Sequence, residues 1–325
     1  MTVLPRIAEI AASIREARGL THKRDIDVVV TRLGLGARNA RVPLGDDCAA
    51  IPDGEGHLLF AIEGFLDTFV AGDPHFAGYC GVMVNLSDIA AMGGRAIAIV
   101  DALWSRNNDG ADPILAGLRA ASEIYGVPVV GGHTNTRAGA ENLAVAVLGR
   151  AGKTLLTSFD AKPGDDLVAA IDLRGRFRDP HPYWDASTGA PPERLRGDLA
   201  LLPEIAEDGL ARAAKDISMA GLVGTALMLL ECSGVGAVID LDAIPRPDGV
   251  QLARWLTAFP SFGYVLGVMP DDSDAVVERF AARGIAAARI GRVDAGRVVR
   301  IREAAAGSEA VVWDFSASAL IGCGR

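Results

Sequence analysis

The chain has 325 residues, 50% of them hydrophobic, and a formal net charge of -9. This length favours two domains, and the apolar content is sufficient for a substantial core. The acidic balance excludes a protein that wraps a polyanion, so we expect no nucleic-acid partner. Residues 1–20 mix charged with apolar side chains, which argues against a signal peptide or a membrane span. We therefore expect a cytoplasmic protein without a membrane partner.

The first half of the chain alternates strand-like apolar runs with amphipathic helical patterns, which predicts an α/β fold. Asp112 is a predicted N-cap, Pro113 follows at the first helical position, and Gly126 ends that helix. The predicted helices cover residues 74–92 and 112–125, and the predicted strands cover residues 57–62, 96–103, 127–130 and 143–148.

The second half begins after a domain boundary that we place near residue 153, ahead of a turn-rich segment at 161–165. The predicted domains are residues 1–152 and residues 153–325. Residues 174–197 are rich in Arg, Pro and Gly without periodicity, which indicates a long loop, either a lid or a disordered surface segment. The other predictions are strands at 167–171, 237–239, 263–269 and 285–291 and helices at 199–214, 219–232 and 272–283.

The strongest indication of a functional site is a set of three aspartates in separated segments: Asp47, Asp88 and Asp216. Each lies beside small or apolar residues, where burial of an unpaired charge is costly. Each carboxylate therefore needs a cation or several hydrogen-bond donors, and oxygen ligands suit Mg²⁺. The three segments predict one site for a divalent metal and a nucleotide phosphate.

Each aspartate also has a purely structural explanation. Asn85 and Asp88 are three residues apart on the predicted helix at 74–92, so they share a face, and Asp88 could instead cap a neighbouring group. Paired acids such as Asp46-Asp47 are common in Asx-turns. Asp216 starts a glycine-spaced segment leading into the helix at 219–232, where it could be an N-cap.

A glycine pair follows the predicted strand at 127–130. Gly131 and Gly132 would let the backbone approach a ligand closely, and the Thr134 hydroxyl and the Asn135 amide could bind phosphate or ribose. The alternative is a tight turn with a hydrogen-bonded histidine.

These motifs together resemble the superfamily of AIR synthetase, thiamine monophosphate kinase, selenophosphate synthetase and the hydrogenase-maturation dehydratase. Gly45-Asp46-Asp47-Cys48-Ala49 and the run from Val84 to Gly93 resemble motifs of the thiamine monophosphate kinases, as does the start of the second domain at 161–165. Gly131-Gly132-His133 and the spacing from Asp216 to Gly221-Leu222 are more similar to selenophosphate synthetase. The chain as a whole is most similar to the AIR-synthase-related branch.

The resemblance implies a two-domain PurM-like α/β (α+β) fold. The N-terminal domain would bind metal and ATP and form a β-barrel across a homodimer, and the C-terminal α/β domain would bind nucleotide and substrate. It also implies Mg²⁺ and ATP as cofactors and assigns Asp47, Asp88 and Asp216 as metal ligands, supported by Asp46 and Asn85.

The chain departs from the family pattern at two positions. The acid that ends a family strand corresponds to Glu63, which we take as a fourth metal ligand, although Asp67 also resembles a family motif. His133 stands where the kinases have Asp, which places the thiamine kinase identity in doubt. Because no cysteine precedes Cys48, selenophosphate synthesis is disfavoured.

The expected activity is Mg²⁺-dependent use of ATP to phosphorylate or activate a small-molecule substrate, as in a kinase or an ATP-dependent synthetase. His133 and Lys215 are the catalytic candidates. The alternative is a nucleotide-binding regulatory or scaffold protein that has lost turnover. The cofactor-binding candidates are Asp46, Asn85, Gly131, Gly132 and Thr134.

Overall fold

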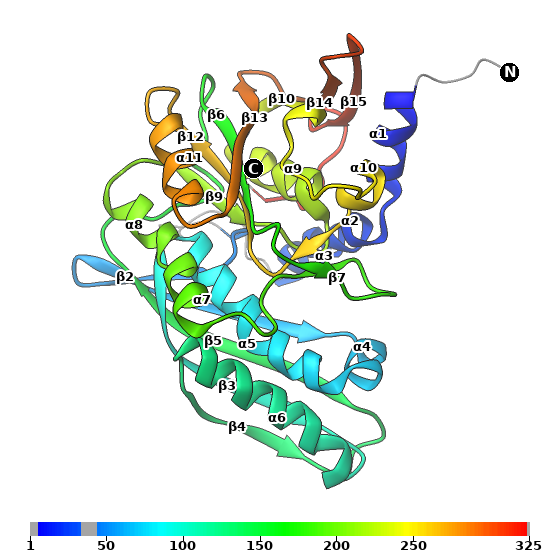
Figure 1. Cartoon of the computed structure of the whole chain (residues 1–325), viewed down its shortest axis with the longest axis vertical. Helices are drawn as coiled ribbons and strands as arrows, with labels where there is room; N and C mark the ends of the chain where they lie inside the picture. Colours follow the sequence, from blue (N-terminus) through cyan, green and yellow to red (C-terminus); the bar gives the residue numbers. More distant parts are fainter. Residues whose placement is uncertain (1–5, 34–43, 324–325) are drawn as a thin grey trace, which may run out of the picture. The chain divides into compact units, whose positions relative to one another are not determined.

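The chain folds into two compact units, which are described separately (Figure 1). The structure is a computed structural model that describes residues 6–33 and 44–323. The smaller unit comprises Asp47–Leu155 and Gly189–Glu207. The larger unit comprises Met1–Asp46, Leu156–Thr188 and Asp208–Arg325. The chain therefore passes between the units close to the predicted boundary, between Leu155 and Leu156, and also at three other points.

The smaller unit contains a five-stranded sheet in the order β1-β2-β5-β3-β4. β3 and β4 are parallel, and the other neighbouring strands are antiparallel. The strands are β1 (Ala49–Asp53), β2 (Gly56–Phe65), β3 (Gly94–Trp104), β4 (Val129–Asn135) and β5 (Asn142–Ala151). The predicted strands are confirmed, although the strand predicted at 127–130 begins later and runs through the glycine pair to Asn135.

Helices α5 (Pro74–Ala91) and α6 (Asn108–Tyr125) lie along one side of this sheet (Figure 1). α5 is buried along almost its whole length, since even its glycines are in close contact with neighbours: a Cβ at Gly78 would lie 2.0 Å from a backbone oxygen of α6. The Asp73 carboxylate caps its N-terminus by accepting from the Phe76 N–H. α4 (Asp67–Gly72), α7 (Pro192–Leu199) and α8 (Leu201–Glu207) complete the unit.

The N-terminus of α6 differs from the prediction. Asn107 caps the helix, accepting from the Gly110 N–H at 2.8 Å, so the predicted cap Asp112 and Pro113 both lie inside the helix. Asn and Asp are both good N-caps, and the sequence contains two possible N-caps, Asn107 and Asp112, within one and a half helical turns. The predicted end is confirmed, because Gly126 adopts the left-handed conformation there.

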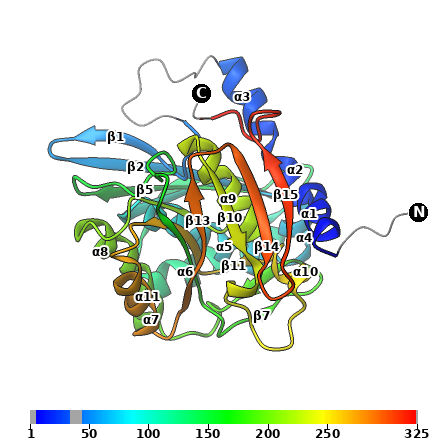
Figure 2. The ribbon, with the colours of Figure 1, turned by 90° about the horizontal axis from the view of Figure 1, so that it is seen from above.

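The larger unit contains a seven-stranded sheet in the order β15-β14-β10-β13-β6-β12-β9, and Figure 2 shows β13, β10, β14 and β15 side by side. The strands predicted at 167–171, 237–239, 263–269 and 285–291 are confirmed within it, and α9 (Gly221–Ser233) and α11 (Ser273–Ala281) confirm two predicted helices. Its strands are β6 (Asp166–Ile171), β9 (Ala213–Asp216), β10 (Gly236–Asp240), β12 (Gly263–Val268), β13 (Ala286–Asp294), β14 (Val298–Glu303) and β15 (Ser308–Asp314).

The N-terminal helices belong to the larger unit. α1 (Arg6–Glu16) packs against β15, and the Arg15 guanidinium donates to the Val311 carbonyl at 2.9 Å. α2 (Arg18–Lys23) contacts α9, with Leu20 buried beside Gly224. α3 (Asp25–Leu33) follows. A 3-10 turn at Leu241–Ala243 (η1) and a short helix, α10 (Leu252–Trp255), complete this unit's helical elements among the described residues.

The prediction of a long loop at 174–197 is wrong. The segment contains β7 (Arg176–Phe177), β8 (Tyr183–Asp185) and most of α7, and β7 and β8 form a small sheet with β11 (Phe259–Pro260). Trp184 packs edge-to-face on Phe177 and Trp255, with ring centroids 5.2 Å apart in each pair. Trp255 and the partner strand β11 come from a distant part of the chain, so the local composition gave no sign of these contacts. The helix predicted at 199–214 is also wrong in part, since β9 begins at Ala213.

The mixed α/β fold is confirmed, but the five-stranded sheet of this single chain is open and not a closed barrel. Among residues 6–33 and 44–323, no helix has the length and apolar character needed to cross a membrane.

Candidate metal and nucleotide site

The buried face of α5 carries two polar side chains. Asn85 is 0% exposed, and its amide nitrogen donates to the carbonyls of Gly81 at 2.7 Å and Val145 at 3.0 Å. These bonds fix the amide between α5 and β5, and no donor among the described residues reaches Asn85 Oδ1. Asp88, one turn later, is 5% exposed. Both residues are buried, on a helix that is buried along almost its whole length.

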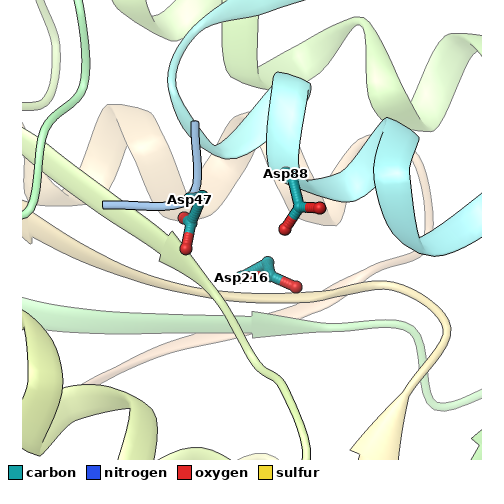
Figure 3. A group of neighbouring side chains, drawn as sticks. All are labelled: Asp47, Asp88 and Asp216. Carbon is teal, nitrogen blue, oxygen red and sulfur yellow. The ribbon is translucent and has the colours of Figure 1, made fainter. Parts of the chain in front are cut away.

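Asp47 and Asp88 lie close together in the smaller unit. Asp47 precedes β1 and is partly buried, and a carboxylate oxygen of Asp47 lies within 4.8 Å of one of Asp88. Figure 3 draws both side chains, together with Asp216 of the larger unit. Two like charges at this separation repel each other in a low-dielectric environment, and a divalent cation bound by both would remove the repulsion.

Asp216 is the last residue of β9 and is 5% exposed. It does not cap α9, whose N-cap position is Ala220, so the alternative explanation of Asp216 as an N-cap is wrong. Gly221 begins the helix with φ of +68°, and a Cβ there would lie 2.1 Å from the Leu256 carbonyl oxygen. Glycine is therefore required where the chain turns from Asp216 into α9.

Asp46 and Lys215 are neighbours in the larger unit. The Lys215 ammonium lies 4.0 Å from Asp46 Oδ1, and both side chains are almost fully buried. Asp46 also accepts from the Ser158 N–H at 2.8 Å and from the Ser158 hydroxyl at 2.7 Å. Sequence reasoning selected Asp46 and Lys215 but missed Ser158, because a lone serine in a turn has no distinguishing pattern.

The glycine pair lies within β4 and not in a turn after it. Gly131, Gly132, His133 and Thr134 are all exposed. The His133 ring lies 6.3 Å from the Trp104 ring, between centroids, on the sheet face opposite Asp101. The alternative explanation of a tight turn is therefore wrong, and these residues form part of an open sheet edge.

Glu63 lies on β2 opposite Val145 of β5 and is partly buried. Asp67 opens α4, where its carboxylate accepts from the Thr68 N–H at 2.7 Å. Directly opposed residues of antiparallel strands share a face, so Glu63 projects to the same side of the sheet as Val145, toward α5. Among the described residues, the group of acids whose oxygens lie within 4.8 Å of one another includes neither Glu63 nor Asp67.

Asp101 of β3 was missed by sequence reasoning. It also lies opposite Val145, so it shares the α5 side of the sheet with Glu63. Burial raises the pKa of the Asp101 carboxyl, and its Oδ2 atom has no hydrogen-bond partner among the described residues. A Cβ on Gly132 would lie 2.4 Å from Asp101 Oδ1, so the glycine makes room for this carboxyl group. The sequence feature that could have identified Asp101 is an acidic residue at an inward-facing position of a largely apolar strand.

Comparison with known proteins places the chain in a family. Residues 45–151 match the N-terminal domain model of AIR synthase related proteins, and residues 185–303 match the C-terminal domain model. "Uncharacterized protein sll0787" of Synechocystis sp. is 46% identical over 97% of this chain and 98% of its own length. Thiamine-monophosphate kinase of Pyrococcus abyssi is 31% identical over 65% of this chain and 70% of its own length.

A solved structure of T. maritima PurL complexed with ATP has a similar fold, with a TM-score of 0.76 at 20% sequence identity. It covers 98% of this chain, and this chain spans 52% of that one. The similarity therefore extends over both compact units. The chain belongs to the family of AIR synthase related proteins.

Proposed function

We propose that the protein is a Mg²⁺-dependent enzyme that uses ATP to phosphorylate or activate a small-molecule substrate. The observation that carries this proposal is the pair of acids Asp47 and Asp88, whose oxygens lie within 4.8 Å in a largely apolar setting. Family membership supports it, since a thiamine-monophosphate kinase and an ATP-bound PurL are among the similar proteins.

In this proposal Asp47, Asp88 and Asp216 hold Mg²⁺, and Glu63 is a further acidic ligand. The residues provide only carboxylate oxygens, which is the donor type that Mg²⁺ prefers. Bound Mg²⁺ would neutralise charge on the ATP phosphates, which allows an acidic protein to bind a polyanion. Asn85 would fix the face of α5 from which Asp88 projects. The exposed backbone of Gly131 and Gly132, with Thr134, would contact the nucleotide, and His133 the substrate.

We also propose that the protein is a homodimer. The side of the five-stranded sheet opposite α5 exposes apolar side chains, here called the apolar face: Ile51, Phe60, Ile62, Val100 and Leu148. Ile62 is 65% exposed. A contiguous apolar surface on a sheet is typical of a protein interface, and a second copy presents the same surface.

Binding of MgATP is tested by the melting temperature and by isothermal calorimetry. A ligand present at 100 times its Kd should stabilise the native protein by about 2.7 kcal/mol. We expect this stabilisation with Mg²⁺ and ATP together, and much less with ATP and a chelator. Absence of Mg²⁺-dependent nucleotide binding at millimolar ligand would overturn the proposal.

Asp88→Asn separates metal binding from folding, because the side chain keeps its shape and loses its charge. We expect the variant to fold and to lose Mg²⁺-dependent nucleotide binding. Asp109→Asn, in the exposed first turn of α6, is the matched control and should bind as the parent does. Nucleotide binding without ATP turnover, across a panel of small-molecule acceptors, would identify the regulatory or scaffold alternative.

A further inference from the structure

The Asp46 carboxylate lies at the centre of a buried polar network in the larger unit. Its two oxygens accept from the Ser158 N–H at 2.8 Å and the Ser158 hydroxyl at 2.7 Å. The Ser233 hydroxyl, at the end of α9, donates to the Ser158 carbonyl at 2.7 Å. The Lys215 ammonium lies 4.0 Å from Asp46 Oδ1. The network therefore links α9, the Ser158 segment, the Asp46 segment and β9.

The backbone before Asp46 is also held closely. Gly45 has φ of +118°, which favours glycine, and a Cβ there would lie 2.4 Å from Cys323 Cβ. The Cys323 segment is fixed in turn by Glu231 of α9, whose carboxylate accepts from the backbone N–H groups of Leu320 at 2.8 Å and Ile321 at 2.7 Å. The position of Asp46 is thus determined by packing as well as by hydrogen bonds.

Lys215 and Asp216 project to opposite faces of the sheet, because successive side chains alternate along a strand. Lys215 is opposite Val265 of β12, which belongs to the hydrophobic core that includes α9. Asp216 is opposite Tyr264, on the other face. The Lys215 ammonium therefore points away from the face on which Asp216 would bind a cation. A lysine buried in this core requires a counter-charge, and Asp46 supplies one.

We propose that Asp46 and Lys215 are positioning residues for the metal site: their buried ion pair fixes the backbone directly before Asp47 and directly before Asp216. This inference rests on the proposed Mg²⁺ site and changes the role of Lys215, which does not contact the phosphates. Asp47 and Asp216 each directly follow a residue of this ion pair. Because the backbone before each of them is fixed, both could bind a cation with little loss of conformational freedom. Ser158 also fixes the Asp46 carboxylate, because its N–H and its hydroxyl donate to the two carboxylate oxygens.

The test uses the full chain and Mn²⁺ as the probe, with free Mn²⁺ measured by electron paramagnetic resonance. Partners that orient metal ligands typically contribute about 10–100-fold to metal affinity, and we expect losses of this size in Asp46→Asn and Lys215→Met. The double variant Asp46→Asn/Lys215→Met should bind no more weakly than the weaker single variant, because the pair acts as one unit. Lys215→Arg should restore part of the affinity.

The double variant also protects the test against misfolding, since it leaves no unpaired buried charge if either single variant fails to fold. Asp165→Asn is the matched control: it removes another buried carboxylate of the larger unit, which lies 3.4 Å from Arg212. This control should keep the parental Mn²⁺ affinity. Folded variants of Asp46 and Lys215 that bind Mn²⁺ as the parent does would overturn the inference, whereas a parent chain that binds no Mn²⁺ would overturn the proposed function itself.

Discussion

The two large sheets of this protein present different outer surfaces to solvent. The apolar face of the smaller unit exposes Ile62 at 65% and Phe60 at 47%. On the larger unit, the corresponding surface of β10, β13 and β14 carries arginines paired with acids, here called the charged face: Arg292, Arg300 and Arg302 with Asp166, Glu309 and Asp240. Both sheets have a core on their other side.

The difference indicates which sheet needs a partner. The arginines of these pairs are 36–63% exposed and keep their guanidinium groups in water, so the charged face is stable in water on its own. The apolar face keeps hydrophobic side chains in water, and covering them with a second copy would release about 25 cal/mol for each Å² buried. An oligomer should therefore form through the apolar face of the smaller unit.

The largest expected effect comes from a charge on the apolar face. In Ile62→Glu, a symmetric dimer would place like charges in its own interface, which costs several kcal/mol. We expect dissociation into monomers, because a cost of several kcal/mol lowers the dimer affinity by about 1,000-fold or more. Sedimentation velocity over a range of concentrations measures this change.

Val311→Glu is the matched control for that substitution. Val311 is an apolar residue of β15 that is 47% exposed, and it lies opposite Arg300 on the charged face. Its substitution should leave the dimer intact. If both variants remain dimeric, or if the parent chain is a monomer at all concentrations, the contrast between the two faces does not predict assembly.

The next largest effect concerns the segment that was expected to be a loop. Trp184 is 5% exposed, and its indole N–H donates to the Asp172 carbonyl at 2.9 Å. Trp184→Ala should therefore lower the free energy of unfolding by about 3–5 kcal/mol, the usual cost of removing a buried Trp. Urea denaturation measures it. A change below about 0.5 kcal/mol, typical of a surface substitution, would show that 174–197 behaves as a surface segment.

A smaller, pH-dependent effect is expected at Asp101. Burial raises its pKa in the folded state above the ordinary value of 3.8. The unfolded chain thus loses this proton at lower pH than the folded chain does, and stability falls as the pH rises through that interval. Asp101→Asn removes the penalty, so it should raise the melting temperature at pH 7 and have less effect near pH 4. Equal effects at both pH values would contradict this account.

The smallest effect is expected on the charged face. Arg302 lies 3.1 Å from Asp240, and its side chain is 48% exposed. Asp240 is 17% exposed, but Arg302 stays solvated, so Arg302→Met should change the free energy of unfolding by less than about 1 kcal/mol and should weaken the salt dependence of stability. A loss of several kcal/mol would mean that the charged face is also a structural or binding surface.

Much of this fold follows from local patterns in the sequence. The helix at 74–92 and the strands at 57–62 and 263–269 were predicted because their apolar spacing, caps and turns lie within a few residues. The elements of 174–197 could not be predicted, because β7 and β8 depend on Trp255 and on pairing with Phe259. Pairing partners far apart in the chain leave no local pattern.

Some residues of the candidate site can likewise be predicted from local sequence, and others cannot. Asp47 and Asp88 could be selected because a carboxylate beside Ala, Ile and Cys is chemically out of place, and the structure brings the two together. Asp101 and Ser158 could not be selected from the sequence. Their roles depend on contacts with residues far along the chain, Val145 for Asp101 and Asp46 for Ser158. The orientation of Lys215 depends on the register of β9 with β12, which the sequence does not specify locally.

The division of the larger unit along the chain has a consequence for its biogenesis. Its first helix, α1, packs against β15, the most C-terminal strand among the described residues. α1 therefore cannot complete this packing until Ser308–Asp314 has been synthesised, whereas every strand of the smaller unit is available once Ala151 has emerged from the ribosome. We expect the smaller unit to acquire its sheet first and the larger unit to complete the packing of α1 on β15 only after Asp314 has emerged.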